Sequence, residues 1–343
     1  MAQGGCRENP RAARRRPRTG MSTWKSRLRA TGSLLKEMAG DWMEDKVLRL
    51  SAALAYYSIF SIAPLLVIAV GIAGGVLGPD AVRGHLDDQL RAMMGPEAAK
   101  AVQSMVQSAS KPSDSAWATA IGFLTLLLGA SGVFGQLKDA LNTIWEVKAL
   151  RSSGLLGFVK ERLLSFGMVL VIGFLLLTSL VLTTALAALM KYFGGMFPIS
   201  EAAVGITAFV VSAGIVTTLF ALIFKVLPDA NVSWRHVWIG AAVTALFFEI
   251  GKFLLGFYLG RQSTASSYGA AGSVVLVLLW VYYTSIILLT GAEFTRVYAK
   301  ATGHAIAPEG NAAAVTAEMR AQQGLPALAP ERASSASRGG GQS

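Results

Sequence analysis

The stretch SSYGAAGSVVLVLLWVYYTSIILLTGAEFTRVYA, residues 266–299, decides the fold of this chain. No charged residue lies between Arg261 and Glu293, and this interval exceeds the roughly 20 apolar residues with which a helix crosses a bilayer core. A helix of this length in a soluble protein carries a polar stripe along its solvent face, and this stretch has none. The sequence therefore predicts a membrane-spanning helix over residues 271–295.

The composition extends this prediction to the whole chain. Of the 343 residues, 53% are hydrophobic and 15% are charged, whereas about a quarter of the residues in soluble proteins are charged. The hydrophobic residues fall in separate long blocks, so we predict an all-α polytopic membrane protein with six transmembrane helices. The predicted spans are residues 50–77, 116–137, 163–189, 202–224, 234–258 and 271–295.

The segments outside these spans have different compositions. Residues 1–22 and 300–343 contain few large apolar side chains and are predicted to be disordered. Residues 23–49 have an amphipathic pattern, which fits either a helix in the plane of the lipid headgroups or a helix packed on the inner surface of the protein. Residues 79–114 are mixed in charge and are predicted to form a small helical extracytoplasmic cap between the first two spans.

Lys and Arg are distributed unevenly between the two sides of this topology. The segments on the side of the termini carry 20 of them, and the segments on the other side carry six. Because cytoplasmic loops are enriched in Lys and Arg, both termini are expected in the cytoplasm. Residues 1–49 carry 12 basic and five acidic residues, a surplus that favours anionic headgroups as partners. The run Arg14-Arg15-Arg16 is too short for a nucleic-acid site, and no nucleic-acid partner is expected.

Glu249 and Lys252 are the strongest candidates for a functional role, because charges inside a span are costly and mark pathways, relays or internal ion pairs. Their spacing of three residues lets them share a helix face. One interpretation is a contact for a substrate or coupling ion in a central cavity, and the other is a structural pair that fixes helix packing. We add to this candidate pathway four residues around an expected proline kink, namely Tyr56, Tyr57, Ser61 and Pro64. The two tyrosines fit helix packing or an interfacial aromatic belt better.

A second group of polar residues follows the second span. Gln136, Asp139, Thr143 and Glu146 line one helix face, which is either the wall of an inner vestibule or, as we favour, the solvated face of a helix end. Glu293 and Arg296 are assigned to the same candidate vestibule. Their simplest interpretation is a surface pair at the inner boundary, within reach of Arg235 or Lys225.

Several motifs together resemble the YihY/virulence factor BrkB family. They are AALAYYSIFSIAPLL (52–66), GQLKDALNTIW (135–145), VSWR (232–235), SYGAAG (267–272), LWVYY (279–283) and GAEF (291–294). The resemblance covers roughly residues 45–300 and implies a bacterial inner-membrane protein of six helices. It implies no agreed catalytic residues.

The family has also carried the name ribonuclease BN, and the sequence does not support that activity. A metal-dependent nuclease needs clustered His, Asp and Glu, but His85, His236 and His304 are expected in different regions. There is also no H-E-x-x-H, G-x-S-x-G or phosphate-binding glycine loop. We therefore expect no enzyme activity, metal or cofactor. The preferred hypothesis is a permease for a lipid or amphipathic solute; the alternative is a non-transporting envelope scaffold, and homo-oligomerisation is compatible with both.

Overall fold

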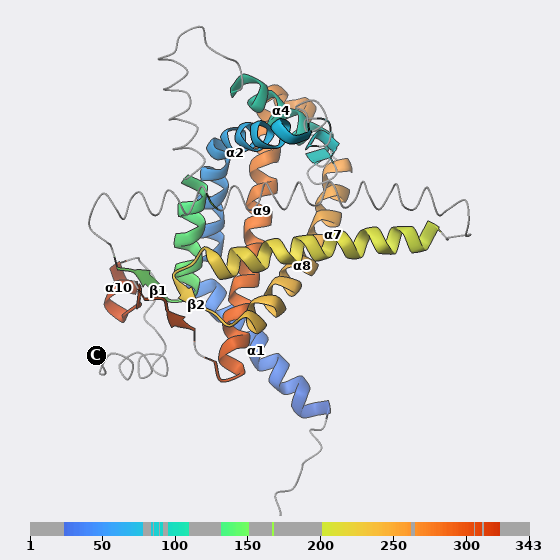
Figure 1. The fold of residues 1–343 in the computed structure, drawn as a ribbon. Helices are drawn as coiled ribbons and strands as arrows, with labels where there is room; N and C mark the ends of the chain where they lie inside the picture. The colour runs from blue at the N-terminus through green and yellow to red at the C-terminus, as the bar shows by residue number, and fades with distance from the viewer. Residues whose placement is uncertain are drawn as a thin grey trace, which may run out of the picture.

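The computed structural model describes residues 24–77, 84, 86–88, 90–91, 95–109, 132–150, 167, 201–261, 265–304, 306–310 and 312–322. This part of the chain is mostly helical (Figure 1). Most of the predicted second span, nearly all of the third and the predicted tail at residues 1–22 lie outside the described residues.

The helices follow the apolar blocks of the sequence. They are α1 (Trp24–Glu44), α2 (Val47–Leu77), α4 (Pro96–Ala109), residues 132–144, α7 (Glu201–Val226), α8 (Trp234–Arg261), α9 (Ala265–Ala301) and α10 (Ala317–Gln322). Three of them contain stretches that are long and apolar enough to cross a membrane: Phe209–Val226, Trp234–Leu254 and Val274–Ala301. The fold is therefore that of a helical membrane protein, as predicted.

Helix α9 is the centre of the described structure and packs against α1, α2, α4 and α8 (Figure 1). Helix α4 covers one end of it, where Val102 and Val277 share a small buried cluster. Helix α7 packs on the other side of α8, through the contact of Phe220 with Phe248 at 5.9 Å between ring centroids. A larger apolar core joins residues 132–144 to α7, α8 and α9.

Helices α8 and α9 approach each other through two reciprocal glycine–threonine contacts. A Cβ atom at Gly240 would lie 1.8 Å from Thr295 Oγ1, and one at Gly291 would lie 1.8 Å from Thr244 Oγ1. Each threonine hydroxyl donates a 2.7 Å hydrogen bond to the glycine carbonyl four residues earlier in its own helix. Small residues of this kind let helix backbones approach closely in a membrane. We call these four residues the Gly–Thr interlock.

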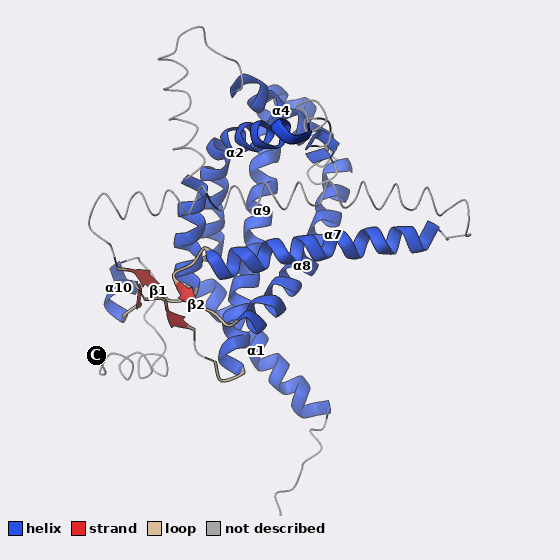
Figure 2. Cartoon of the chain, viewed as in Figure 1, coloured by secondary structure: helices blue, strands red, loops and turns tan. Residues whose placement is uncertain are grey.

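Two short strand pairs lie at the end opposite α4 and correct one prediction (Figure 2). Strand β1 (Val147–Ala149) pairs antiparallel with β4 (Ala312–Ala314), and β2 (Ala230–Asn231) pairs antiparallel with β3 (Ala307–Pro308). The described part of the chain remains mostly helical, with these strand pairs added. Residues 306–310 and 312–322 are not the disordered tail that their Ala, Gly and Pro content indicated. Their backbone bonds go to partners far away in the sequence, which local composition does not report.

Candidate functional site

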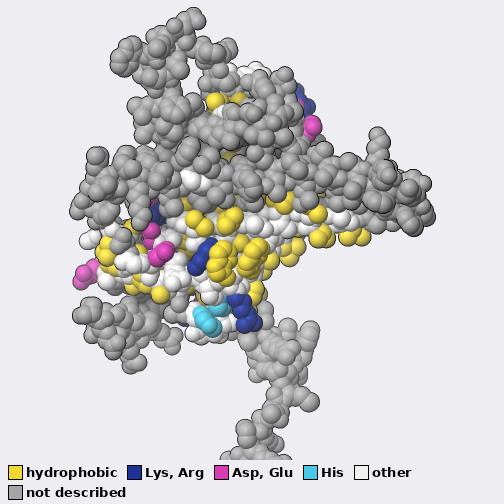
Figure 3. Space-filling view, viewed as in Figure 1, with side chains coloured by type: hydrophobic (Ala, Val, Ile, Leu, Met, Phe, Trp, Pro, Cys, Tyr) yellow, Lys and Arg dark blue, Asp and Glu magenta, His cyan; other side chains and the backbone are white. Residues whose placement is uncertain are grey.

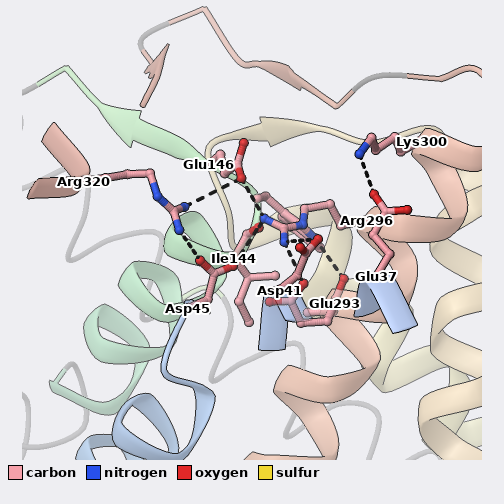
Figure 4. Close-up of polar contacts among 11 residues, drawn as sticks. Glu37, Asp41, Asp45, Ile144, Glu146, Glu293, Arg296, Lys300 and Arg320 are labelled. Atoms are coloured by element: carbon pink, nitrogen blue, oxygen red, sulfur yellow. Dashed lines mark hydrogen bonds and ion pairs between the residues drawn. The ribbon is translucent and has the colours of Figure 1, made fainter. Parts of the chain in front are cut away.

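The densest group of charged side chains in the described structure surrounds Arg296, near the end of α9 (Figure 4). Its guanidinium lies 2.8 Å from Asp41 and 3.3 Å from Asp45. The same group lies 3.1 Å from both Glu146 and Glu293. One arginine thus joins α1, the connection after residues 132–144 and α9 itself.

A second arginine reaches the same place from the C-terminal part of the chain. Arg320 of α10 lies 2.9 Å from Asp45 and 3.6 Å from Glu146 (Figure 4). Its side chain is only 1% exposed. We call the following six residues the charge cluster: Asp41, Asp45, Glu146, Glu293, Arg296 and Arg320.

The ends of two helices place the acidic residues of this cluster. Asp45 and Lys46 form the turn after α1, where Lys46 has φ 53°, and Glu146 has φ 55° in the turn that follows residues 132–144. Non-glycine residues with such angles are strained and persist only where the surrounding structure holds them. At the second helix end Arg296 donates a 2.6 Å hydrogen bond to the carbonyl of Ile144, which is one of the carbonyls a helix terminus leaves without an intrahelical partner.

The charge cluster is buried and unbalanced. Glu293 is fully buried, and Asp45 and Arg320 are each 1% exposed. Four carboxylates face two guanidinium groups, so negative charge exceeds positive charge when all six are ionised. Burying charges is costly unless they are paired, and each arginine here contacts at least two carboxylates. The cluster therefore depends on both arginines.

The structure corrects the interpretation of Glu293 and Arg296 as a surface pair. Both are buried, and their additional partners are the acidic residues of α1 and Glu146 rather than Arg235 or Lys225. The sequence pattern missed this because burial at a helix end is decided by other parts of the chain. Of the candidate vestibule residues, Glu146, Glu293 and Arg296 come together.

The other three candidate vestibule residues lie outside the charge cluster. Asp139 is exposed, Gln136 and Thr143 are partly buried, and the Thr143 hydroxyl donates to the Asp139 carbonyl at 2.8 Å. The assignment of the whole stripe to a solvated helix face stays a prediction.

Sequence reasoning missed Asp41, Asp45 and Arg320. The first two had a usable signal, since Glu37, Asp41 and Asp45 recur every four residues and must share one helix face. That face packs on α9: Glu37 is paired with Lys300, and the Trp42 indole donates to Thr290 at 3.0 Å. Of the two interpretations of residues 23–49, the second half of α1 therefore follows packing on the protein itself. Arg320 had no local signal.

Glu249 and Lys252 form the expected ion pair on α8, with 2.7 Å between Lys252 Nζ and Glu249 Oε2. The Glu249 side chain is 12% exposed and that of Lys252 is 32% exposed. Lys252 follows Phe248 by one helical turn, so the pair lies at the edge of the face that packs on α7. The pair is thus neither sealed in the core nor fully on the surface.

The remaining pathway candidates lie on α2. Tyr56 is 61% exposed and contacts Phe60, while Tyr57 is 44% exposed. Ser61 is buried and donates a 2.9 Å hydrogen bond to the Tyr57 carbonyl. Helix α2 continues through Pro64 as one element. No contact described in the structure joins these residues to the pair on α8.

Two of the three histidines, His236 and His304, lie together. The rings of His236 and His304 are 4.9 Å apart. His236 uses both ring nitrogens, one 2.5 Å from Ser233 Oγ and the other 2.8 Å from Thr302 Oγ1. These bonds tie the start of α8 to the end of α9. Within the described residues no group of His, Cys, Asp and Glu is arranged to hold a metal ion, and His85 lies outside them.

Comparison with known protein families shows to which family this chain belongs. The model of the family described as virulence factor BrkB matches residues 38–316, which is most of the chain. The chain belongs to the virulence factor BrkB family. The BrkB match contains five of the six residues of the charge cluster and the whole Gly–Thr interlock, and Arg320 lies just beyond it.

Several proteins similar in sequence to this BrkB protein are named UPF0761 membrane proteins. One from Stenotrophomonas maltophilia (strain K279a) is 28% identical over 74% of this chain and 58% of its own length. One from Teredinibacter turnerae is 28% identical over 82% of this chain and 64% of its own length. A third, from Pseudoalteromonas translucida, is 25% identical over 77% of this chain and 87% of its own length.

The chain spans somewhat less than two thirds of the length of the first two of these relatives. No solved structure matches it. The comparisons and the apolar helices together place this BrkB protein in a membrane.

Proposed function

We propose that this BrkB protein is a multi-pass protein of the bacterial inner membrane that acts as a permease for a lipid or an amphipathic solute. The observation that carries the proposal is the Glu249–Lys252 ion pair in α8. No ATP-binding loop occurs in the sequence, so transport would depend on a gradient or on the solute itself.

The position of the pair supports a role beyond packing. Glu249 lies 15 residues after the start of α8, which corresponds to about 20 Å of helix and to the apolar part of a bilayer. Charged residues at that depth face protein or a water-filled cavity and mark pathways. The partial exposure of Lys252 at the α7 edge leaves its ammonium accessible to an anionic group of a solute.

The charge cluster supports a division of the molecule into two parts. The part that the cluster joins is fixed, and the part of α8 that carries Glu249 and Lys252 is held more loosely. It joins α1, α9, the connection after residues 132–144 and α10 at one end of the molecule, and the pair on α8 belongs to none of these contacts. We place the charge cluster on the cytoplasmic side, together with both termini. The support is the surplus of Lys and Arg in the segments that gather there.

The alternative proposal is an envelope scaffold that organises partner proteins and transports nothing. The Gly–Thr interlock and the buried charge cluster favour it, because both resist rearrangement. No internal inverted repeat of the kind found in many transporters is evident in the sequence. An enzyme is not proposed.

Transport by the purified full-length chain in proteoliposomes tests the proposal. The solutes are labelled anionic lipids and amphipathic anions, and wild type is compared with Glu249→Gln/Lys252→Met. We expect wild type to move at least one solute and the double variant to lose most of that rate, about tenfold or more. A control variant, Lys100→Gln/Lys148→Gln, changes two exposed lysines elsewhere and should leave the rate unchanged.

The outcomes separate the two proposals. Movement by wild type and by the control, but not by the Glu249→Gln/Lys252→Met protein, supports the permease and locates its path. Equal rates in all three proteins contradict the role of the pair. No movement of any solute by folded wild type favours the scaffold, and partner capture by cross-linking in cells is then the next test.

A further inference from the structure

The turn between α7 and α8 lies where two membrane-spanning stretches end. The apolar stretch of α7 ends at Val226, and that of α8 begins at Trp234. Because both stretches end here, residues 227–233 lie at one surface of the bilayer. The end of α7 and the start of α8 are therefore at the level of the lipid headgroups.

The turn is held rigidly by its neighbours. Asp229 forms a 2.9 Å salt bridge with Lys138. Its backbone N–H donates to Asn142 Oδ1 and its carboxylate accepts from Asn142 Nδ2, both at 2.9 Å. Strand β2 pairs with β3. A ligand that binds here meets a surface that is already ordered, which lowers the entropic cost of binding.

Two cations and exposed apolar side chains share this surface. Lys225 Nζ lies 5.9 Å from the centre of the Trp234 ring and donates a 2.8 Å hydrogen bond to the Val232 carbonyl. Trp234 is 50% exposed and Trp238, one helical turn further, is 44% exposed. Figure 3 shows Lys and Arg side chains beside exposed hydrophobic ones on this side of the molecule. We define the turn site as Lys225, Val226, Trp234, Arg235 and Trp238.

The positive charge of the turn site is not neutralised by the described part of the chain. The one carboxylate in the turn, that of Asp229, is already paired with Lys138. Lys225 makes its hydrogen bonds to the Val232 carbonyl and, at 3.4 Å, to the Asn231 side chain, both uncharged. Arg235 is exposed and has no salt bridge to a described residue. Among the described residues, these two cations at the bilayer surface thus have no carboxylate partner.

We infer that the turn site binds the phosphate group of an anionic phospholipid, with Lys225 and Arg235 contacting the headgroup. Tryptophan rings favour the headgroup level of a bilayer, and basic residues there attract anionic lipids. Below the headgroup, Trp238, Ala242 and Leu246 are exposed at intervals of four residues on one face of α8. This face provides a continuous apolar track for the acyl chains. The inference holds whether or not the protein is a permease.

Photo-cross-linking of the full-length protein in phosphatidylcholine vesicles tests the site. The vesicles contain a trace of phosphatidylglycerol or phosphatidylcholine with a photoactivatable acyl chain, and labelled peptides are mapped by mass spectrometry. We expect the phosphatidylglycerol probe to label residues 238–246 and Lys225→Gln/Arg235→Gln to reduce that labelling about 30-fold at limiting probe, since each surface cation contributes about a fivefold factor. Labelling near residues 24–49 serves as an internal reference, because the substitutions leave that region unchanged.

The control is Lys100→Gln/Lys148→Gln, which removes the same formal charge at exposed positions outside the turn site. It should retain the labelling of residues 238–246. The inference is overturned if the phosphatidylcholine probe labels these residues equally or if Lys225→Gln/Arg235→Gln keeps the signal. It is also overturned if the control loses as much as the test variant, because net charge rather than the turn site would then be responsible. Loss of transport is not a readout here, so this result is independent of the permease proposal.

Discussion

At the scale of single residues, Arg296 is the residue that holds the charge cluster together. It is 8% exposed and contacts four carboxylates from three parts of the chain. Those carboxylates are excluded from water by the same packing that excludes the arginine. Removing the guanidinium therefore leaves buried negative charge without compensation, which is far more costly than removing a pair at the surface.

We predict that Arg296→Met lowers the free energy of unfolding by about 3–5 kcal/mol. The measurement is denaturant unfolding of the purified protein in detergent. Lys300→Met breaks the exposed pair with Glu37 and should cost less than about 1 kcal/mol. Glu293→Gln should also cost less than Arg296→Met, because it removes one of the four carboxylates that outnumber the two arginines. Equal losses in all three variants would show that the charge cluster contributes no more than a surface pair.

At the scale of helices, the Gly–Thr interlock fixes how α8 and α9 cross. Each glycine provides the space that the threonine of the other helix fills, and each threonine satisfies its hydroxyl within its own helix. The spacing of four residues in both helices was present in the sequence. The partner of each glycine was not, because two isolated G-x-x-x-T patterns do not show which helices meet.

Gly240→Ala and Gly291→Ala are each predicted to destabilise the protein by about 1–3 kcal/mol, the usual cost of overpacking. The added methyl group would overlap a threonine side chain that the crossing holds in place. Gly214→Ala in α7 is the matched control, since no atom lies within 4 Å of a Cβ at that position; it should be neutral or slightly stabilising. The same detergent unfolding measurement compares the three proteins. Neutral values for both Gly240→Ala and Gly291→Ala would mean that the helices separate at no cost.

At the scale of the whole molecule, the C-terminal residues 306–310 and 312–322 close the end of the helical bundle. Strands β3 and β4 pair with β2 and β1, and Arg320 enters the charge cluster. Residues more than 270 positions apart, Asp45 and Arg320, are thereby joined. The first and last described parts of the chain stabilise each other.

A chain that ends at His304 should unfold at a clearly lower temperature than the full-length protein. It loses both strand pairings and leaves Asp45 with one arginine fewer. A chain that ends at Gln322 keeps all of these contacts and should match the full-length protein within about 2 °C, a shift that corresponds to less than 1 kcal/mol for a domain of this size. Thermal unfolding in detergent, followed by circular dichroism, measures both. Equal midpoints for the two truncated chains would contradict a stabilising role of the C-terminal segment.

The sequence by itself determined the membrane class, the family and the helices α2, α7, α8 and α9. A long uncharged block of the chain forms a helix in a bilayer, because every backbone polar group then bonds within that helix. It also determined the pairing of Glu249 with Lys252, because a spacing of three residues on a helix is local geometry. Only the tertiary structure decided the charge cluster, the Gly–Thr interlock and the order of residues 306–310 and 312–322. These depend on which distant residues share a buried space, and charge, size and composition along the chain do not specify that.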